Sequence, residues 1–146
     1  MKKTLQGKFR PRNPEKYKGD ASNIVYRSSW EKIFMNWADR NSKIVSWQSE
    51  EKALWYNDPV TKKKRRYFPD FIIMFERDGK MITEMIEVKP KAQVDGPNPN
   101  PKRRTAAWVN QVKTYLTNMA KWEAAAKVCE DRGWNFRLVT EKDLGI

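Results

Sequence analysis

The pattern of apolar and polar positions in the middle of the chain predicts a β-hairpin. Phe68 and the segment 71–75 form a near-continuous apolar run, as in a strand buried on both faces, and Asp70 interrupts it. Asp78-Gly79 follows, a pair typical of a tight hairpin turn. The second strand is expected from Met81 to Lys89. The first strand therefore carries a carboxylate where a core would favour an apolar residue.

The second strand carries its charged residues on one face. Side chains alternate along a strand, so Ile86 and Val88 point one way while Glu87 and Lys89 point the other. An acid on one strand and an acid with a lysine on the next form an arrangement typical of a catalytic site. A solvated ion pair on an exposed strand face is the alternative explanation of Glu87 and Lys89.

Helical spacing of apolar residues predicts a first helix from about Ser29 to Arg40. The apolar face that this helix lays against the core is expected to consist of Tyr26, Trp30, Ile33, Phe34 and Trp37. Ser28 is followed three residues later by Glu31, which is typical of a capping box.

A second, long helix is predicted from an N-cap at Thr105 to about Arg132, with Gly133 as its end. Its apolar stripe is expected to comprise Trp108, Val112, Tyr115, Leu116, Met119, Trp122, Ala126 and Cys129. Cys129 is thus assigned to the core and not to a nucleophilic role.

Shorter segments complete the predicted architecture. Strands are expected at 44–47, 53–56 and 134–140, and the proline-rich segment 90–101 is expected to be a loop. The order of elements predicts an α/β fold with a central mixed β-sheet flanked by α-helices, formed by residues 24–146 as a single domain. Residues 1–23 lack periodicity and are expected to be a basic, flexible N-terminal arm.

Composition narrows the possible functions. The chain of 146 residues has 30 Lys and Arg against 18 Asp and Glu, a net charge of +12, so a polyanion such as double-stranded DNA is the expected partner. With no histidine and one cysteine, common zinc sites and Ser-His or Cys-His catalysis are excluded. No segment approaches the roughly 20 apolar residues of a membrane span. No signal peptide is evident after Met1, so we expect the chain to be made and used in a cytosol.

Basic clusters are the candidate DNA contacts. The residues expected to bind the phosphate backbone are Lys8, Arg10, Arg12, Lys62, Lys63, Lys64, Arg65, Arg66, Lys91, Lys102, Arg103 and Arg104. The alternatives are a solubilising tail for residues 1–23 and a solvated loop for residues 62–66.

Asp70, Glu87 and Lys89 together suit metal-dependent hydrolysis of a phosphodiester. Two carboxylates can hold a hard cation such as Mg²⁺ (or Mn²⁺), which binds the scissile phosphate. The lysine can then orient or help to deprotonate the attacking water. Every hydrolytic step is expected to run on carboxylates, lysine and metal, because histidine is absent.

The segments Pro69-Asp70 and Glu87-Val88-Lys89 resemble the motif of the PD-(D/E)XK, or restriction-endonuclease-like, nucleases. The resemblance implies a Mg²⁺-dependent endonuclease and a third acid on the first helix, the position of Glu31. Gln111 and Tyr115 are similar to the Gln-x-x-x-Tyr element of one branch of this superfamily. That similarity implies that Gln111 helps to hold substrate or metal-bound water, whereas Tyr115 is assigned to the core.

Across residues 10–142 the chain resembles the head-completion nucleases of contractile-tailed bacteriophages, and it is also similar to the N-terminal domain of transposon end-cleaving endonucleases. The first resemblance implies a role in finishing DNA-filled heads before tail joining, with portal or neck proteins as expected partners. A catalytically inactive neck protein and a branched-DNA resolvase or defence nuclease are the alternatives. The sequence leaves the oligomeric state open.

Overall fold

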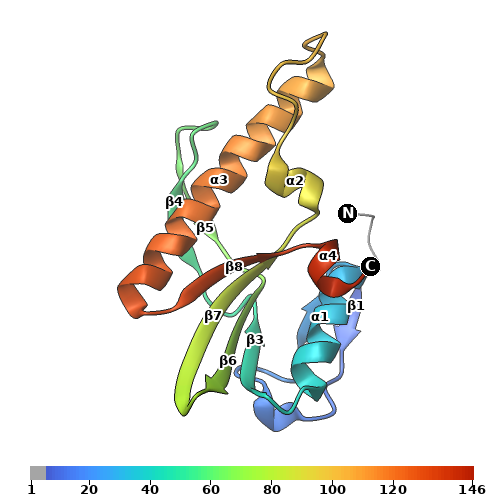
Figure 1. Ribbon diagram of the computed structural model, residues 1–146, viewed down its shortest axis with the longest axis vertical. Helices are drawn as coiled ribbons and strands as arrows, with labels where there is room; N and C mark the ends of the chain where they lie inside the picture. The colour runs from blue at the N-terminus through green and yellow to red at the C-terminus, as the bar shows by residue number, and fades with distance from the viewer. Residues whose placement is uncertain (1–5) are drawn as a thin grey trace.

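A computed structural model describes residues 6–146 and shows a four-stranded sheet with helices on both faces (Figure 1). The elements in chain order are β1 (Gly7–Phe9), η1 (Pro14–Lys16), β2 (Ile24–Tyr26), α1 (Ser29–Arg40), β3 (Ile44–Ser49), β4 (Leu54–Asn57), β5 (Lys64–Tyr67), β6 (Phe71–Arg77), β7 (Lys80–Val88), α2 (Lys91–Asp95), α3 (Ala106–Arg132), β8 (Asn135–Val139) and α4 (Glu141–Leu144). The predicted α/β class is confirmed.

The central sheet has the strand order β3-β6-β7-β8 and is mixed, because β7 and β8 pair in parallel while the other pairs are antiparallel. The predicted hairpin is β6–β7. Asp78 and Gly79 form its turn with φ values of +52° and +77°, the left-handed conformation that two-residue hairpin turns require. No helix of residues 6–146 is long and apolar enough to cross a membrane.

Two apolar clusters hold α1 and α3 on opposite faces of the sheet. On one face, Phe34 of α1 stacks on Phe71 of β6, with ring centroids 4.4 Å apart, above Ile86 of β7. On the other face, Ala125 and Cys129 of α3 pack with a cluster completed by Leu54, Tyr56, Tyr67, Ile72 and Met85. The alternation predicted for β7 is therefore correct, and Glu87 lies on the α3 side with Met85.

The first residues that the structure describes are folded, which contradicts the predicted flexible arm. β1 and β2 form an antiparallel pair, and Phe9 and Tyr17 lie in the core. Lys16 donates from Nζ to the carbonyl oxygens of Ala38, Asp39 and Asn41 at 2.8–2.9 Å. A helix leaves its last carbonyls without partners, so this lysine caps the C-terminus of α1. The part of the predicted arm before residue 6 lies outside the described residues.

Three further predictions were wrong in detail. Residues 91–95 form the helix α2 and not a loop, since Pro90 presets a backbone from which a helix can start. Phe68 is 42% exposed and precedes β6. Asp70 likewise lies just before that strand and not within it.

The predicted apolar stripes were too long. In α3, Leu116 and Met119 are 46% and 44% exposed, because the N-terminal half of this helix extends beyond the sheet (Figure 1). Ala126 is also exposed. In α1, Ile33 and Trp37 lie at the edge of the packed face and are 37% and 42% exposed. Helical periodicity marks an apolar face but not where its partner surface ends.

The packing of residues 7–26 gives a test of the corrected domain boundary. Replacing Tyr17 with Ala should destabilise the whole domain by about 3–5 kcal/mol, the usual cost of deleting a buried aromatic ring. The ring lies 4.8 Å from that of Trp47, and its hydroxyl donates to Glu51 at 2.6 Å. The measurement is urea unfolding. The exposed Arg10→Ala variant is the control, and a Tyr17→Ala midpoint equal to that of the control would restore the flexible arm.

Candidate active site

Asp70 and Glu87 lie side by side at one end of the central sheet. Phe71 pairs with Ile86 in the antiparallel register of β6 and β7, which brings the preceding Asp70 next to the following Glu87. The Asp70 amide donates to Glu87 Oε1 at 3.3 Å, and the Val88 amide donates to Asp70 Oδ2 at 2.8 Å. Each carboxylate thus accepts a hydrogen bond from a backbone amide of the opposite segment. This is the juxtaposition that the sequence pattern predicted.

Tyr67 and Lys89 hold the Glu87 carboxylate from two sides. The Tyr67 hydroxyl donates to Oε1 at 2.6 Å, and Lys89 Nζ lies 3.6 Å from Oε2. Glu87 is 5% exposed, whereas Lys89 and Asp70 keep some contact with solvent. Buried Glu87 is therefore oriented by a hydroxyl and a cation, and Lys89 remains accessible to a bound molecule.

Burial and mutual repulsion dominate the electrostatics of this pair. Burial raises the pKa of Asp70 well above its usual range, and the negative charges of Glu87 and Glu31 raise that pKa further. Burial also raises the pKa of Glu87, although Lys89 and the Tyr67 hydroxyl partly offset this increase. Lys89 offsets only part of the repulsion between the two acids, so a metal cation placed between them would relieve the rest.

Glu31 approaches the pair from the N-terminus of α1. Its backbone amide donates to Ser28 Oγ at 3.2 Å, as an N-cap requires, but its carboxylate accepts from the Arg27 amide at 3.2 Å and not from the Ser28 amide. The capping function is therefore confirmed for Ser28, while the box is not closed. Burial raises the pKa of Glu31, and the charges of Glu50 and Glu87 add to this effect.

The donor set suits a hard cation held by two protein carboxylates. Within residues 6–146, no three His, Cys, Asp or Glu side chains converge tightly enough to form a ligand cluster, so Glu31 is near the pair without completing a triad. Magnesium needs only one or two carboxylates, since water and substrate phosphate fill the remaining positions. The chemistry of Asp70 and Glu87 therefore suits a cation such as Mg²⁺ or Mn²⁺, and metal binding by these residues and by Glu31 stays a prediction.

Sequence reasoning missed Tyr67 and Lys121. Lys121 Nζ lies over the rings of Tyr56 and Tyr67, at 5.8 and 5.6 Å from their centroids. Burial lowers the pKa of Lys121, as does the positive charge of Lys89. The sequence could have indicated Lys121, because it is four residues before Ala125, which is buried in α3, and so lies on the same face of the helix toward the sheet. Its approach to the site depends on how α3 crosses the sheet.

Gln111 lies apart from the carboxylates. It is exposed on α3 and lines a pocket between α2 and α3, whose lining includes none of Asp70, Glu87 and Lys89. Tyr115 lines the same pocket and is only partly buried, in contrast to the core position that was expected. The role of Gln111 at the site stays a prediction.

Most of the basic residues predicted to contact DNA are exposed. On β5, Lys64 and Arg66 point to solvent beside Trp55, whereas Arg65 lies 3.6 Å from Asp58. The other exposed members of the predicted set are Lys8, Arg10, Arg12, Lys62, Lys63, Lys102, Arg103 and Arg104.

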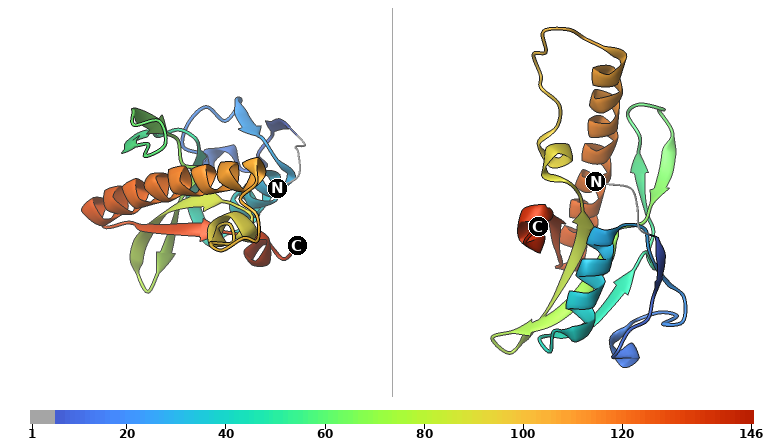
Figure 2. Two further views of the ribbon diagram at one scale, coloured as in Figure 1. Left: turned by 90° about the horizontal axis from the view of Figure 1, so that it is seen from above. Right: turned by 90° about the vertical axis from the view of Figure 1, so that its right-hand side faces the viewer.

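The hairpin β4–β5 that carries Lys64–Arg66 lies alongside α3 (Figure 2). Lys91 is engaged with Asp95 at 2.6 Å. DNA contact by these residues stays a prediction.

Comparison with known proteins agrees with this geometry. The family model described as TnsA-like endonuclease N terminal matches residues 41–141. The chain is 41% identical to the head completion nuclease of Enterobacteria phage T4 over 141 residues, which cover 94% of this chain and 92% of the phage protein. No solved structure matches the chain. The paired acids, the adjoining lysine and both sequence comparisons lead to one conclusion: the chain belongs to the TnsA-like N-terminal endonuclease family.

Proposed function

We propose that this chain is a metal-dependent DNA endonuclease that acts in the completion of phage heads. The observation that carries the proposal is the Asp70–Glu87 pair, with Glu87 buried and Lys89 beside it, in a chain of net charge +12. The head-completion role rests on the similarity to the T4 protein. Portal or neck proteins as partners, and action in the host cytoplasm or at the virion neck, belong to the same proposal.

Asp70 and Glu87 would hold Mg²⁺ or Mn²⁺, and Glu31 is the nearby third acid of the metal site. The cation, when bound, polarises the scissile phosphate and lowers the pKa of a coordinated water. The hydroxyl of Tyr67 keeps Glu87 Oε1 in one orientation, which leaves Oε2 directed at Lys89. Lys89 would hold the attacking water or a phosphate oxygen. Lys121, whose Nζ lies over the Tyr67 ring, would help to stabilise the negative charge that develops on the phosphate during cleavage.

The Asp70→Asn variant tests the site through both activity and stability. Cleavage of supercoiled DNA in Mg²⁺ should be lost, because a metal ligand loses its charge. Since the pKa of Asp70 is raised in the folded state, folding favours its protonated form, and the stability gained below the unfolded pKa is lost as pH rises. At pH 7 in EDTA, a neutral amide should therefore raise the Tm by about 2–4 °C, the effect of about 1 kcal/mol.

The exposed Asp131→Asn variant is the matched control for this measurement, since Asp131 makes only a surface pair with Lys127. Its Tm and cleavage should stay at the wild-type level. Wild-type cleavage by Asp70→Asn would overturn the assigned function. A lowered Tm in EDTA would show that the two acids stabilise the fold instead of straining it.

Tyr67→Phe tests whether the orientation of Glu87 matters. The change removes one hydrogen bond from Glu87 Oε1 and keeps the buried ring, so single-turnover cleavage should fall roughly 10–100-fold, as for other residues that orient a metal ligand. Tyr56→Phe is the control, because Tyr56 is a buried tyrosine of the same hairpin that makes no bond to Glu87. Equal losses in both variants would assign the effect to packing.

The exposed face of β5 gives a test of DNA contact. Simultaneous replacement of Lys64 and Arg66 by Ala should weaken duplex binding and reduce the log–log salt slope by about 2, since each lost phosphate contact removes about 0.9. Arg65→Ala is the comparison, because Arg65 already faces Asp58. Binding is measured by fluorescence anisotropy in EDTA at several salt concentrations. An unchanged slope in the double variant would exclude this face from the DNA interface.

A further inference from the structure

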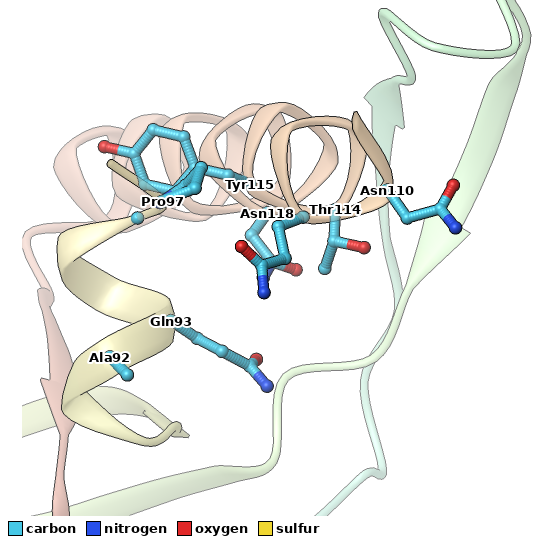
Figure 3. Close-up of a pocket in the computed structure, with 9 residues that line it drawn as sticks. Ala92, Gln93, Pro97, Asn110, Thr114, Tyr115 and Asn118 are labelled. Carbon is cyan, nitrogen blue, oxygen red and sulfur yellow. The ribbon is translucent and has the colours of Figure 1, made fainter. Parts of the chain in front are cut away.

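The pocket between α2 and α3 (Figure 3) differs in chemistry from the charged surface of the rest of the chain. It has a volume of about 440 Å³. None of its lining side chains is charged, although the chain carries 30 basic residues. Four carboxamides line it, and these are Gln93, Asn110, Gln111 and Asn118. Thr114 and Tyr115 add two hydroxyl groups.

Both walls of the pocket are connected along the chain to residues of the candidate active site. α2 begins two residues after Lys89, and Ala92 and Gln93 on this helix line the pocket. On the opposite wall, Asn118 precedes Lys121 by one turn of α3. Asn118 also lines a second cavity, between α3 and the β4–β5 hairpin, to which Lys121 contributes. A nucleotide next to the scissile phosphate could therefore reach the pocket.

Asn118 supplies an observation that points to a ligand. The residue is 5% exposed, and its Nδ2 has no hydrogen-bond partner among the described residues. A buried amide without a partner is unfavourable, so such groups in folded proteins normally meet a water or a ligand. Figure 3 shows the Asn118 and Gln93 side chains extending from facing helices into the same space.

The part of the pocket wall formed by Gly96 and Tyr115 is preformed. Gly96 has a φ of +83°, and a Cβ at this position would lie 2.7 Å from the ring of Tyr115, so the backbone packs directly on that ring. The loop beyond it is tied to α3, because Trp108 Nε1 donates to the carbonyl of Asn98 at 2.7 Å. The spacing between α2 and α3 is therefore held without a ligand.

We propose that this pocket binds an unpaired nucleobase of the DNA substrate, adjacent to the bond that is cut. Carboxamides pair with base edges because each offers a donor and an acceptor side by side, whereas phosphates are bound by cations. A neutral, amide-lined pocket therefore suits a base and not a backbone. The proposal rests on the function proposed above and specifies its substrate: DNA with an extruded or unpaired nucleotide, which costs less to insert than a paired one.

The test compares two duplexes that differ in a single nucleotide. One carries an unpaired 2-aminopurine as a one-nucleotide bulge, and the other is fully paired. Binding is measured in EDTA by anisotropy, together with 2-aminopurine emission, so that it does not depend on cleavage. The wild-type chain should bind the bulged duplex about 10-fold more tightly, the contribution of one well-made base contact. Emission should change as the base leaves the stack.

Two variants act on the pocket in different ways. Gln93→Ala removes one exposed carboxamide, and Ala92→Phe fills the space without removing a polar group. Both should lose the preference for the bulge and retain wild-type affinity for the paired duplex. Ala126→Phe is the matched control, since Ala126 is exposed on α3 outside the pocket. Unchanged Tm values would show that the variants are folded.

The outcomes separate this proposal from the nuclease function. Equal affinity of the wild-type chain for the two duplexes would overturn the base pocket, as would a bulge preference that survives Ala92→Phe. Either result leaves Mg²⁺-dependent cleavage untouched. A chain that binds the bulge but cuts no DNA in Mg²⁺ would instead overturn the nuclease function and retain the pocket.

Discussion

The burial of two carboxylates side by side is the constraint on which this structure depends. Asp70 and Glu87 repel each other, and their pKa values rise because the sheet end excludes water. Backbone amides of both strands and the Tyr67 hydroxyl hold the pair in place. Such an arrangement costs folding free energy unless a cation is present. It is the kind of local conflict that proteins keep at functional sites.

The rest of the fold supports this pair from three directions. α1 brings Glu31 to one side, α3 brings Lys121 to the other, and the hairpin β4–β5 supplies Tyr67. Residues 7–26 do not form a free arm. This segment stabilises α1 instead, because Lys16 caps the C-terminal carbonyls of that helix. The position of Glu31 at the N-terminus of α1 thus depends also on Lys16 at the opposite end of that helix.

The surface divides into charged and neutral regions with different tasks in the proposed function. Exposed cations on β5 and before α3 suit the phosphate backbone, which carries no sequence information. The carboxamides between α2 and α3 suit a base edge. Both regions are on elements that extend beyond the sheet (Figures 1 and 2). In the proposed function, the parts that recognise substrate are thus separate from the acids that cut it.

The sequence by itself determined the hairpin β6–β7, the face that Glu87 shares with Lys89, and the limits of α1 and α3. These features follow from local rules: strand alternation, the left-handed turn at Asp78-Gly79, and the caps at Ser28, Thr105 and Gly133. The family also followed from sequence, because its motif lies within one hairpin.

Only the tertiary structure decided which side chains join that motif and which apolar residues are covered. Tyr67 and Lys121 reach the acids because α3 crosses the sheet beside β4–β5, and Leu116 is exposed because the same helix outruns the sheet. Residues 7–26 offered no periodicity, since scattered side chains such as Phe9 and Tyr17 anchor them. Periodicity reports one element at a time, whereas packing depends on the distances between elements.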